Sequence, residues 1–137
     1  MILPRCLLSA TRVAFLWGVG LLLCPMPARA ADPVREVAIA IDHARLATQV
    51  TALAAVQARL HQLVNCLVGP RDNLFDGSAG NPCANEGGGA IPDTADEAMI
   101  VLLRYALDKA VLGLQTGDLH LAQRYAVEAQ AYLTAYR

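Results

Sequence analysis

Histidine is the residue type in this sequence best suited to metal chemistry. Imidazole is the commonest metal ligand, which makes His43, His61 and His120 the candidates for a transition-metal site. No two of them are four residues apart, as a pair of ligands on one helix turn requires. The histidines therefore indicate a metal centre only as an alternative, and the leading expectation is a protein without a cofactor.

Catalytic motifs are missing from the sequence. Ser78 is the only serine after residue 30, and it does not lie in a Gly-x-Ser-x-Gly context. Gly87-Gly88-Gly89 is not followed by the Lys-Ser or Lys-Thr of a phosphate-binding loop. We therefore expect a protein that is not an enzyme.

Aromatic side chains offer a contact surface instead. Tyr125, Tyr132 and Tyr136 line one side of the last predicted helix, and Phe75 lies in a long loop. Half-buried tyrosines usually form the edge of a core, whereas an exposed row suits a partner. These four residues are the candidates for a partner surface.

The first 30 residues have the pattern of a cleavable export signal. Arg5 and Arg12 precede or flank the apolar run 13–23, and Ala28-Arg29-Ala30 is a small-x-small cleavage site. The run has about half of the ~20 residues that span a bilayer. We predict cleavage after Ala30 and a periplasmic or secreted protein with no membrane insertion. A lipoprotein anchored through Cys24 stays a minor alternative.

Export decides which cysteines matter. Cys66 and Cys83 are the two that remain after residue 30, and neither belongs to a Cys-x-x-Cys motif. Two cysteines in an oxidising compartment most often pair. We predict a structural disulfide, which would stabilise a small domain by roughly 3 kcal/mol.

Residues 31–137 are enough for one small domain. They hold eight basic and twelve acidic residues, and the basic residues are scattered. This charge excludes nucleic acid as a partner and leaves an unknown protein or a small ligand, with a homodimer also open.

Two helical regions must position these residues. From Val34 to Val68 the sequence has no glycine or proline, and Ile39, Leu46, Leu53, Leu60 and Leu67 recur every seven residues. Asp32-Pro33 predicts the start of the first region, 33–68, and Gly69-Pro70 its end. In the second region, 94–137, Thr94 and Glu97 form a predicted capping box, Gly117 a C-cap and Asp118 an N-cap.

The two regions resemble each other at an offset of 66 residues. Asp42, Ala44, Leu46, Gln49, Leu53 and Gln57 align with Asp108, Ala110, Leu112, Gln115, Leu119 and Gln123. In this register Thr51-Ala52 aligns with the turn at Gly117-Asp118. We therefore predict a break near residues 48–51 and an all-α, four-helix bundle of two hairpins, with three helices including one long first helix as the alternative.

Residues 69–93 predict a long loop, since they contain six glycines and three prolines. Loops of this length in a compact domain are either functional or held in place. The predicted disulfide would tie Cys83 to the end of the first helical region.

Two resemblances rest on short motifs. The stretch 106–129, with Gly117 and its alanines, resembles the hairpin of small periplasmic metal-binding helical bundles, whose histidines recur at nearly every turn; here only His120 is kept. The segments Asn65-Cys66-Leu67-Val68-Gly69-Pro70 and Asn81-Pro82-Cys83 resemble a loop of uncharacterised exported bacterial proteins. The first resemblance implies a periplasmic metal-binding or metal-buffering protein, which is our alternative. The leading expectation is an exported, non-enzymatic binding or interaction module.

Overall fold

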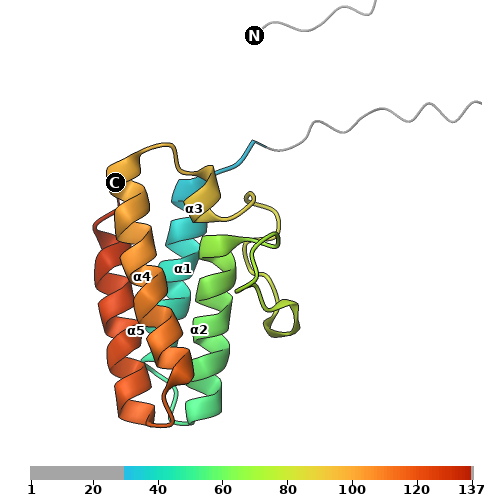
Figure 1. Ribbon diagram of the computed structural model, residues 1–137. Coiled ribbons are helices and arrows are strands. Elements are labelled where there is room, and N and C mark those ends of the chain that lie inside the picture. Colours follow the sequence, from blue (N-terminus) through green and yellow to red (C-terminus); the bar gives the residue numbers. More distant parts are fainter. Residues whose placement is uncertain (1–29, 137) are drawn as a thin grey trace, which may run out of the picture.

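The computed structural model describes residues 30–136, so residues 1–29 of the predicted signal peptide lie outside the described part. Helices and turns account for all its regular structure, with no strand among residues 30–136 (Figure 1). In chain order the elements are α1 (Pro33–Ala47), α2 (Leu53–Val68), the 3-10 turn η1 (Gly77–Ala79), α3 (Ala90–Asp93), α4 (Glu97–Gln115) and α5 (Leu119–Thr134). The predicted all-α fold is confirmed.

The predicted break in the first helical region is also confirmed. α1 ends at the C-cap Thr48, whose Oγ1 donates to the carbonyl of Arg45 at 2.7 Å. Asp32 caps the other end, because its side chain accepts from the backbone N–H of Arg35, and Pro33 is the first helical residue. The alternative of one long first helix is wrong.

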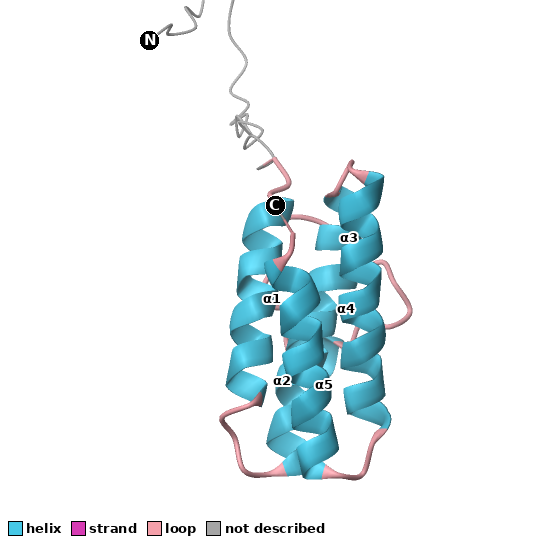
Figure 2. Ribbon diagram, turned by 90° about the vertical axis from the view of Figure 1, so that its left-hand side faces the viewer, coloured by secondary structure: helices cyan, strands magenta, loops and turns pink. Residues whose placement is uncertain are grey.

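The four long helices form two antiparallel hairpins. α1 packs on α2 and α4 on α5, and the hairpins join through α1 against α5 and α2 against α4. Both hairpin turns lie at one end of the bundle, while α3 and the long loop lie toward the other (Figure 1). Figure 2 shows the same arrangement from the side.

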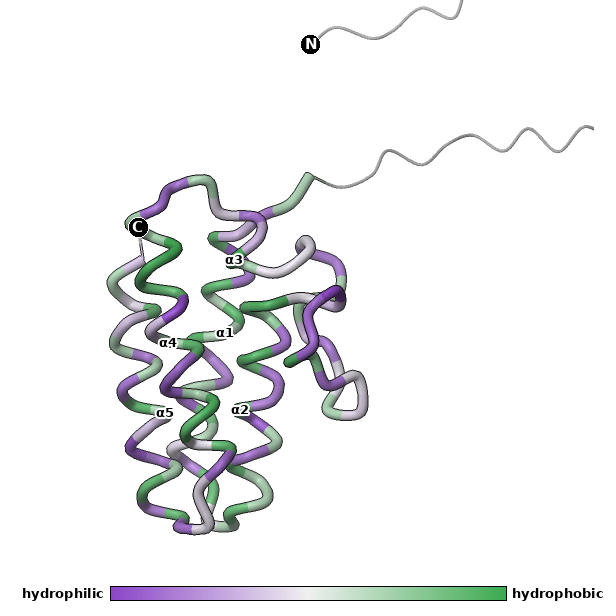
Figure 3. The backbone as a smooth tube through the Cα atoms, viewed as in Figure 1, coloured by the Kyte–Doolittle hydropathy of each residue, from purple (hydrophilic) through white to green (hydrophobic). Residues whose placement is uncertain are grey.

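The core runs along the whole bundle. Apolar and polar residues alternate along each helix, as an amphipathic helix requires (Figure 3). Leu60, Leu63 and Leu67 of α2 are fully buried, and α5 presents Ala122, Ala126 and Ala129, which are also fully buried. The core thus combines large residues from α2 with small ones from α5, and Leu60 packs directly against Gly113 of α4.

The buried stripe of the first hairpin differs from the predicted heptad seam. Ile39, Leu46 and Leu53 are only half-buried, whereas Ala40, Ala44 and Ala47 have no exposed surface. The predicted seven-residue repeat assumed one continuous helix. The chain is not helical at residues 48–52, so α1 and α2 do not share one register.

Two predicted caps are wrong. The N-cap of α4 is Asp96, whose Oδ1 accepts from the N–H groups of Ala98 and Met99, and Thr94 instead closes α3 by donating to the carbonyl of Ala90. The C-cap of α4 is Thr116 rather than Gly117. Aspartate competes with threonine as an N-cap, and here it lies nearer the helix. The predicted N-cap Asp118 is confirmed.

A helix that crosses a membrane has to be long and apolar. None of the helices within residues 30–136 has the length and apolar character for it.

Candidate functional site

A pocket opens between the end of α2, the long loop, α3 and α4. Its volume is about 720 Å³, within the usual range for small-molecule sites. Val68 and Leu107 contribute apolar surface from α2 and α4, and Ile91 and Pro92 contribute it from α3. The predicted loop 69–93 is therefore not only a connection, because its last residues form a helical turn that closes one side of a pocket.

Charged side chains surround this apolar surface. They are Arg71, Asp72, Asp93, Arg104 and Asp108. Asp72 and Asp93 each accept a backbone N–H, from Leu74 and Gly88 respectively. Within residues 30–136, neither arginine makes a hydrogen bond or an ion pair to another side chain, nor does Asp108. Two guanidinium groups and one carboxylate thus remain available to a ligand.

The pocket wall at Gly88 belongs to a backbone strap, residues 87–89. A Cβ on Gly89 would lie 2.5 Å from the carbonyl carbon of Val68, and Gly69 and Gly89 have φ values of 70° and 116°. Only glycine tolerates both the close approach and the left-handed backbone. The glycine run therefore lets the strap lie directly on the last turn of α2.

A fully buried carboxylate holds the strap from below. Oε1 of Glu36 accepts the N–H of Gly89 at 2.9 Å, and Oε2 has no hydrogen-bond partner within residues 30–136. Burial raises the pKa of Glu36 to about 7; the Gly89 N–H opposes this shift, and the nearby acidic groups Asp93, Asp32 and Glu86 reinforce it. Glu36 therefore gains or loses a proton near neutral pH.

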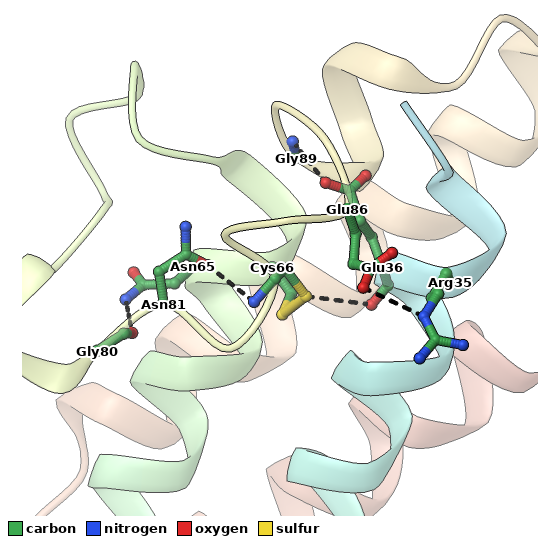
Figure 4. Close-up of a disulfide and its surroundings, with 9 residues drawn as sticks. Arg35, Glu36, Asn65, Cys66, Gly80, Asn81, Glu86 and Gly89 are labelled. Atoms are coloured by element: carbon green, nitrogen blue, oxygen red, sulfur yellow. Dashed lines mark hydrogen bonds and ion pairs between the residues drawn. A yellow bond between two sulfur atoms is a disulfide. The ribbon is translucent and has the colours of Figure 1, made fainter. Parts of the chain in front are cut away.

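The disulfide Cys66–Cys83, predicted from the sequence, is present next to this carboxylate (Figure 4). Both cysteines are buried, and Sγ of Cys83 lies 3.8 Å from the backbone carbonyl of Glu36. Arg35 makes an ion pair with Glu86 at 3.2 Å, and the N–H of Asp32 donates to the carbonyl of Glu86. The middle of the long loop is thereby fixed to α1 as well as to α2.

A buried asparagine holds the rest of the loop. Nδ2 of Asn65 donates to the carbonyls of Asp76 and Gly80, both at 2.7 Å, and its Oδ1 accepts the N–H of Asp76 at 2.9 Å. Gln62 donates to Ala79 one turn earlier on α2. The loop is therefore an ordered support for the pocket.

The structure places the three candidate histidines apart. The pKa of His43 is lowered, first by burial and then by the Arg59 charge, while the Asp42 charge opposes the shift. His61 faces Asp76 at 3.7 Å, and His120 is exposed near the start of α5. Across residues 30–136, no three His, Cys, Asp or Glu side chains gather in a way that could hold a metal ion.

The candidate aromatic surface is largely tied to neighbouring groups. Tyr132 stacks on Tyr105 of α4 with ring centroids 5.4 Å apart, and Nζ of Lys109 lies 5.9 Å from the ring centroid of Tyr125. The hydroxyl of Tyr136 hydrogen-bonds to that of Thr94 at 2.9 Å. Phe75 is half-buried against the core.

These contacts join α5 to α4 and α3, and Phe75 packs against the core. Tyr105, which is 51% exposed, was not among the candidates, although its spacing from Val101 on α4 marks one exposed apolar stripe.

Sequence reasoning missed the pocket residues and Glu36. Arg71, Arg104 and Asp108 look like ordinary surface charges until α3 folds beside α4. Glu36 left a signal, because it precedes Ala40 and Ala44 at intervals of four residues and so lies on the buried face of α1.

Comparison with protein-family models, with curated proteins and with solved structures found no match. The site has to be interpreted from its own chemistry.

Proposed function

We propose that this protein is an exported, non-enzymatic binding module whose ligand is a small molecule held in the pocket between α2, α3 and α4. The observation that supports it most is apolar surface from three elements next to two arginines that no other residue engages. An apolar base with a few polar groups that set orientation is the common design of ligand sites.

The supports of the pocket are consistent with this function. The strap at residues 87–89 lies on the backbone of α2 and is held by Glu36, and the loop is tied by Asn65 and the disulfide. Because these walls are already fixed, less conformational entropy of the protein is lost when a ligand binds. A metal-buffering role has no comparable support among the described residues.

Export belongs to the same proposal. The pattern of residues 1–30 and a buried disulfide both fit an oxidising compartment such as the periplasm. Mass spectrometry of the protein recovered from the periplasm tests it: an N-terminus at Ala31 supports cleavage, whereas a diacylated Cys24 supports the lipoprotein.

The pocket is tested with a neutral apolar probe, indole, titrated into the isotope-labelled mature protein. We expect saturable amide shifts centred on Val68, Gly88 and Leu107. The variant Leu107→Arg should abolish them, and Leu112→Arg, on an exposed position of the same helix, should not. Because Leu107 also packs on the core, Pro92→Arg serves as a second blocking variant at an exposed position. Shifts scattered over the surface, or unchanged by both blocking variants, would refute the pocket.

A further inference from the structure

The charges around the pocket specify more than an apolar ligand. A purely anionic molecule would meet three carboxylates, those of Asp72, Asp93 and Asp108. A purely cationic molecule would meet the guanidinium groups of Arg71 and Arg104. A ligand that carries one charge of each sign can satisfy both sets, since each sign then has an opposite partner at the rim.

The arginines and the carboxylates of the pocket differ in how many of them already have a partner within the protein. Arg71 follows the end of α2 and Arg104 lies on α4, so the guanidinium groups approach the pocket from two elements. A guanidinium presents five N–H donors in a planar fork that matches a carboxylate. The arginines therefore suit a carboxylate of the ligand.

Asp108 is the carboxylate available for a cation. Asp72 and Asp93 each spend an oxygen on a backbone N–H, whereas Asp108 has no hydrogen bond or ion pair within residues 30–136. It lies one helical turn after Arg104 on the same face of α4. A ligand ammonium at Asp108 and a ligand carboxylate at Arg104 would then be about one helical turn apart.

The geometry points to a short peptide with both ends free and an apolar side chain as the ligand of this pocket. Its carboxylate binds Arg104 and Arg71, its ammonium binds Asp108, and its side chain covers Val68, Ile91 and Leu107. This inference rests on the proposed function, because it assigns a ligand class to the same pocket.

End-blocked peptides test the assignment in calorimetric titrations of the mature protein, unfolded and refolded to strip bound molecules. The ligands are Leu-Leu, its N-acetyl form, its C-terminal amide and free leucine. We expect Leu-Leu to bind at least tenfold more tightly than either blocked form. Leucine as tight as Leu-Leu would overturn the peptide length and leave a free amino acid as the ligand.

Matched variants assign each end. In Arg104→Gln the free dipeptide should lose most of its advantage over the amide, and in Arg71→Gln/Arg104→Gln the two should bind equally, while the acetyl form stays weaker in both. In Asp108→Asn the free dipeptide and the acetyl form should bind equally, while the amide stays weaker. Arg124→Gln, an exposed arginine on α5 outside this pocket, should change neither ratio.

The outcomes separate the two proposals. Blocked and free dipeptides that bind alike, or none that binds while indole still does, would overturn the peptide assignment and leave the pocket. Amide shifts with indole that neither Leu107→Arg nor Pro92→Arg abolishes would overturn the pocket itself.

Discussion

Gln57 and Gln123 make the same pair of hydrogen bonds in opposite hairpins. Nε2 of Gln57 donates to the carbonyls of Leu114 and Thr116 at the α4–α5 turn, at 3.1 and 3.2 Å. Nε2 of Gln123 donates to the carbonyls of Thr48 and Val50 at the α1–α2 turn, at 3.4 and 2.9 Å. Donors and acceptors are all related by the offset of 66 residues, so each hairpin closes the turn of the other.

Replacing either glutamine with alanine should destabilise the fold by a similar amount. Each change removes two half-buried hydrogen bonds to turn carbonyls, for a loss of about 1–2 kcal/mol in the free energy of unfolding. Urea denaturation of Gln57→Ala and Gln123→Ala measures it. The control is Gln49→Ala, since that side chain is exposed and makes none of these bonds; a loss as large in the control would show that the turns are not held this way.

The buried faces repeat at the same offset. The pairs are Val37 and Leu103, Ala40 and Ala106, Ala44 and Ala110, Ala47 and Gly113, Val56 and Ala122, Leu60 and Ala126, Leu63 and Ala129, and Leu67 and Leu133. The bundle is therefore two copies of one hairpin, packed about an approximate twofold axis. Size is kept in some pairs, such as Ala44 and Ala110 or Leu67 and Leu133, whereas Val56, Leu60 and Leu63 of α2 each correspond to an alanine of α5.

The contact between Leu60 and Gly113 shows how this complementarity is achieved. A Cβ on Gly113 would lie only 2.6 Å from Cδ1 of Leu60, so glycine makes room for the leucine. Leu60→Ala would leave a cavity beside Gly113, which has no side chain to fill it, and we expect a loss of about 2–5 kcal/mol in unfolding free energy. Leu112→Ala, at a position 40% exposed, should cost far less in the same denaturation experiment.

The fold could be predicted from the sequence because most helix ends have local signals and the two hairpins repeat. Gly69-Pro70 and Asp32-Pro33 mark helix ends by backbone chemistry, and the 66-residue repeat revealed a break that no glycine or proline announces. The cap at Asp96 was missed since Thr94 offered an equally good local pattern. The choice between Asp96 and Thr94 as the N-cap depends on α3, because the last turn of α3 uses the Thr94 hydroxyl.

The pocket could not be predicted for a different reason. Arg71, Ile91 and Arg104 are far apart in the sequence, and they meet only because the strap at residues 87–89 folds onto α2. The three histidines lie on α1, α2 and α5, and no cluster of three metal-ligating side chains forms among residues 30–136.

The disulfide is expected to contribute strongly to stability. It closes a loop of 17 residues, for which chain entropy gives about 3 kcal/mol. The double variant Cys66→Ala/Cys83→Ala should lose that amount in urea denaturation. Reductant should lower the stability of the wild type toward the variant and leave the variant unchanged; a wild type insensitive to full reduction would contradict the prediction.

Glu36 breaks the repeat, since its counterpart at the same offset is Leu102. An acidic side chain in place of a leucine costs stability when it is charged, because burial disfavours the ion. What it provides is the acceptor for Gly89 in the strap, which the second hairpin does not need. The departure from the repeat thus falls beside the pocket.

The stability of the wild type should fall as the pH rises from about 4.5 to about 7. With a pKa of about 7 in the folded chain and an ordinary pKa of 4.5 for a glutamate in water, Glu36 holds its proton in the folded state after the unfolded chain has lost it. Unfolding then releases a proton between those pH values, and the free energy of unfolding decreases by about 3 kcal/mol across the window.

Glu36→Gln isolates this effect, because glutamine keeps an oxygen for the Gly89 N–H and cannot ionise. The variant should match the wild type near pH 4, lack the decline between pH 4.5 and 7, and be more stable at pH 8. In Asp93→Asn the decline should end at a lower pH, since Asp93 is the acidic group that raises the pKa of Glu36 most. Glu97→Gln, at an exposed position, should keep the wild-type profile. Parallel curves for wild type and Glu36→Gln in urea denaturation from pH 4 to 8 would show that Glu36 does not titrate in this window.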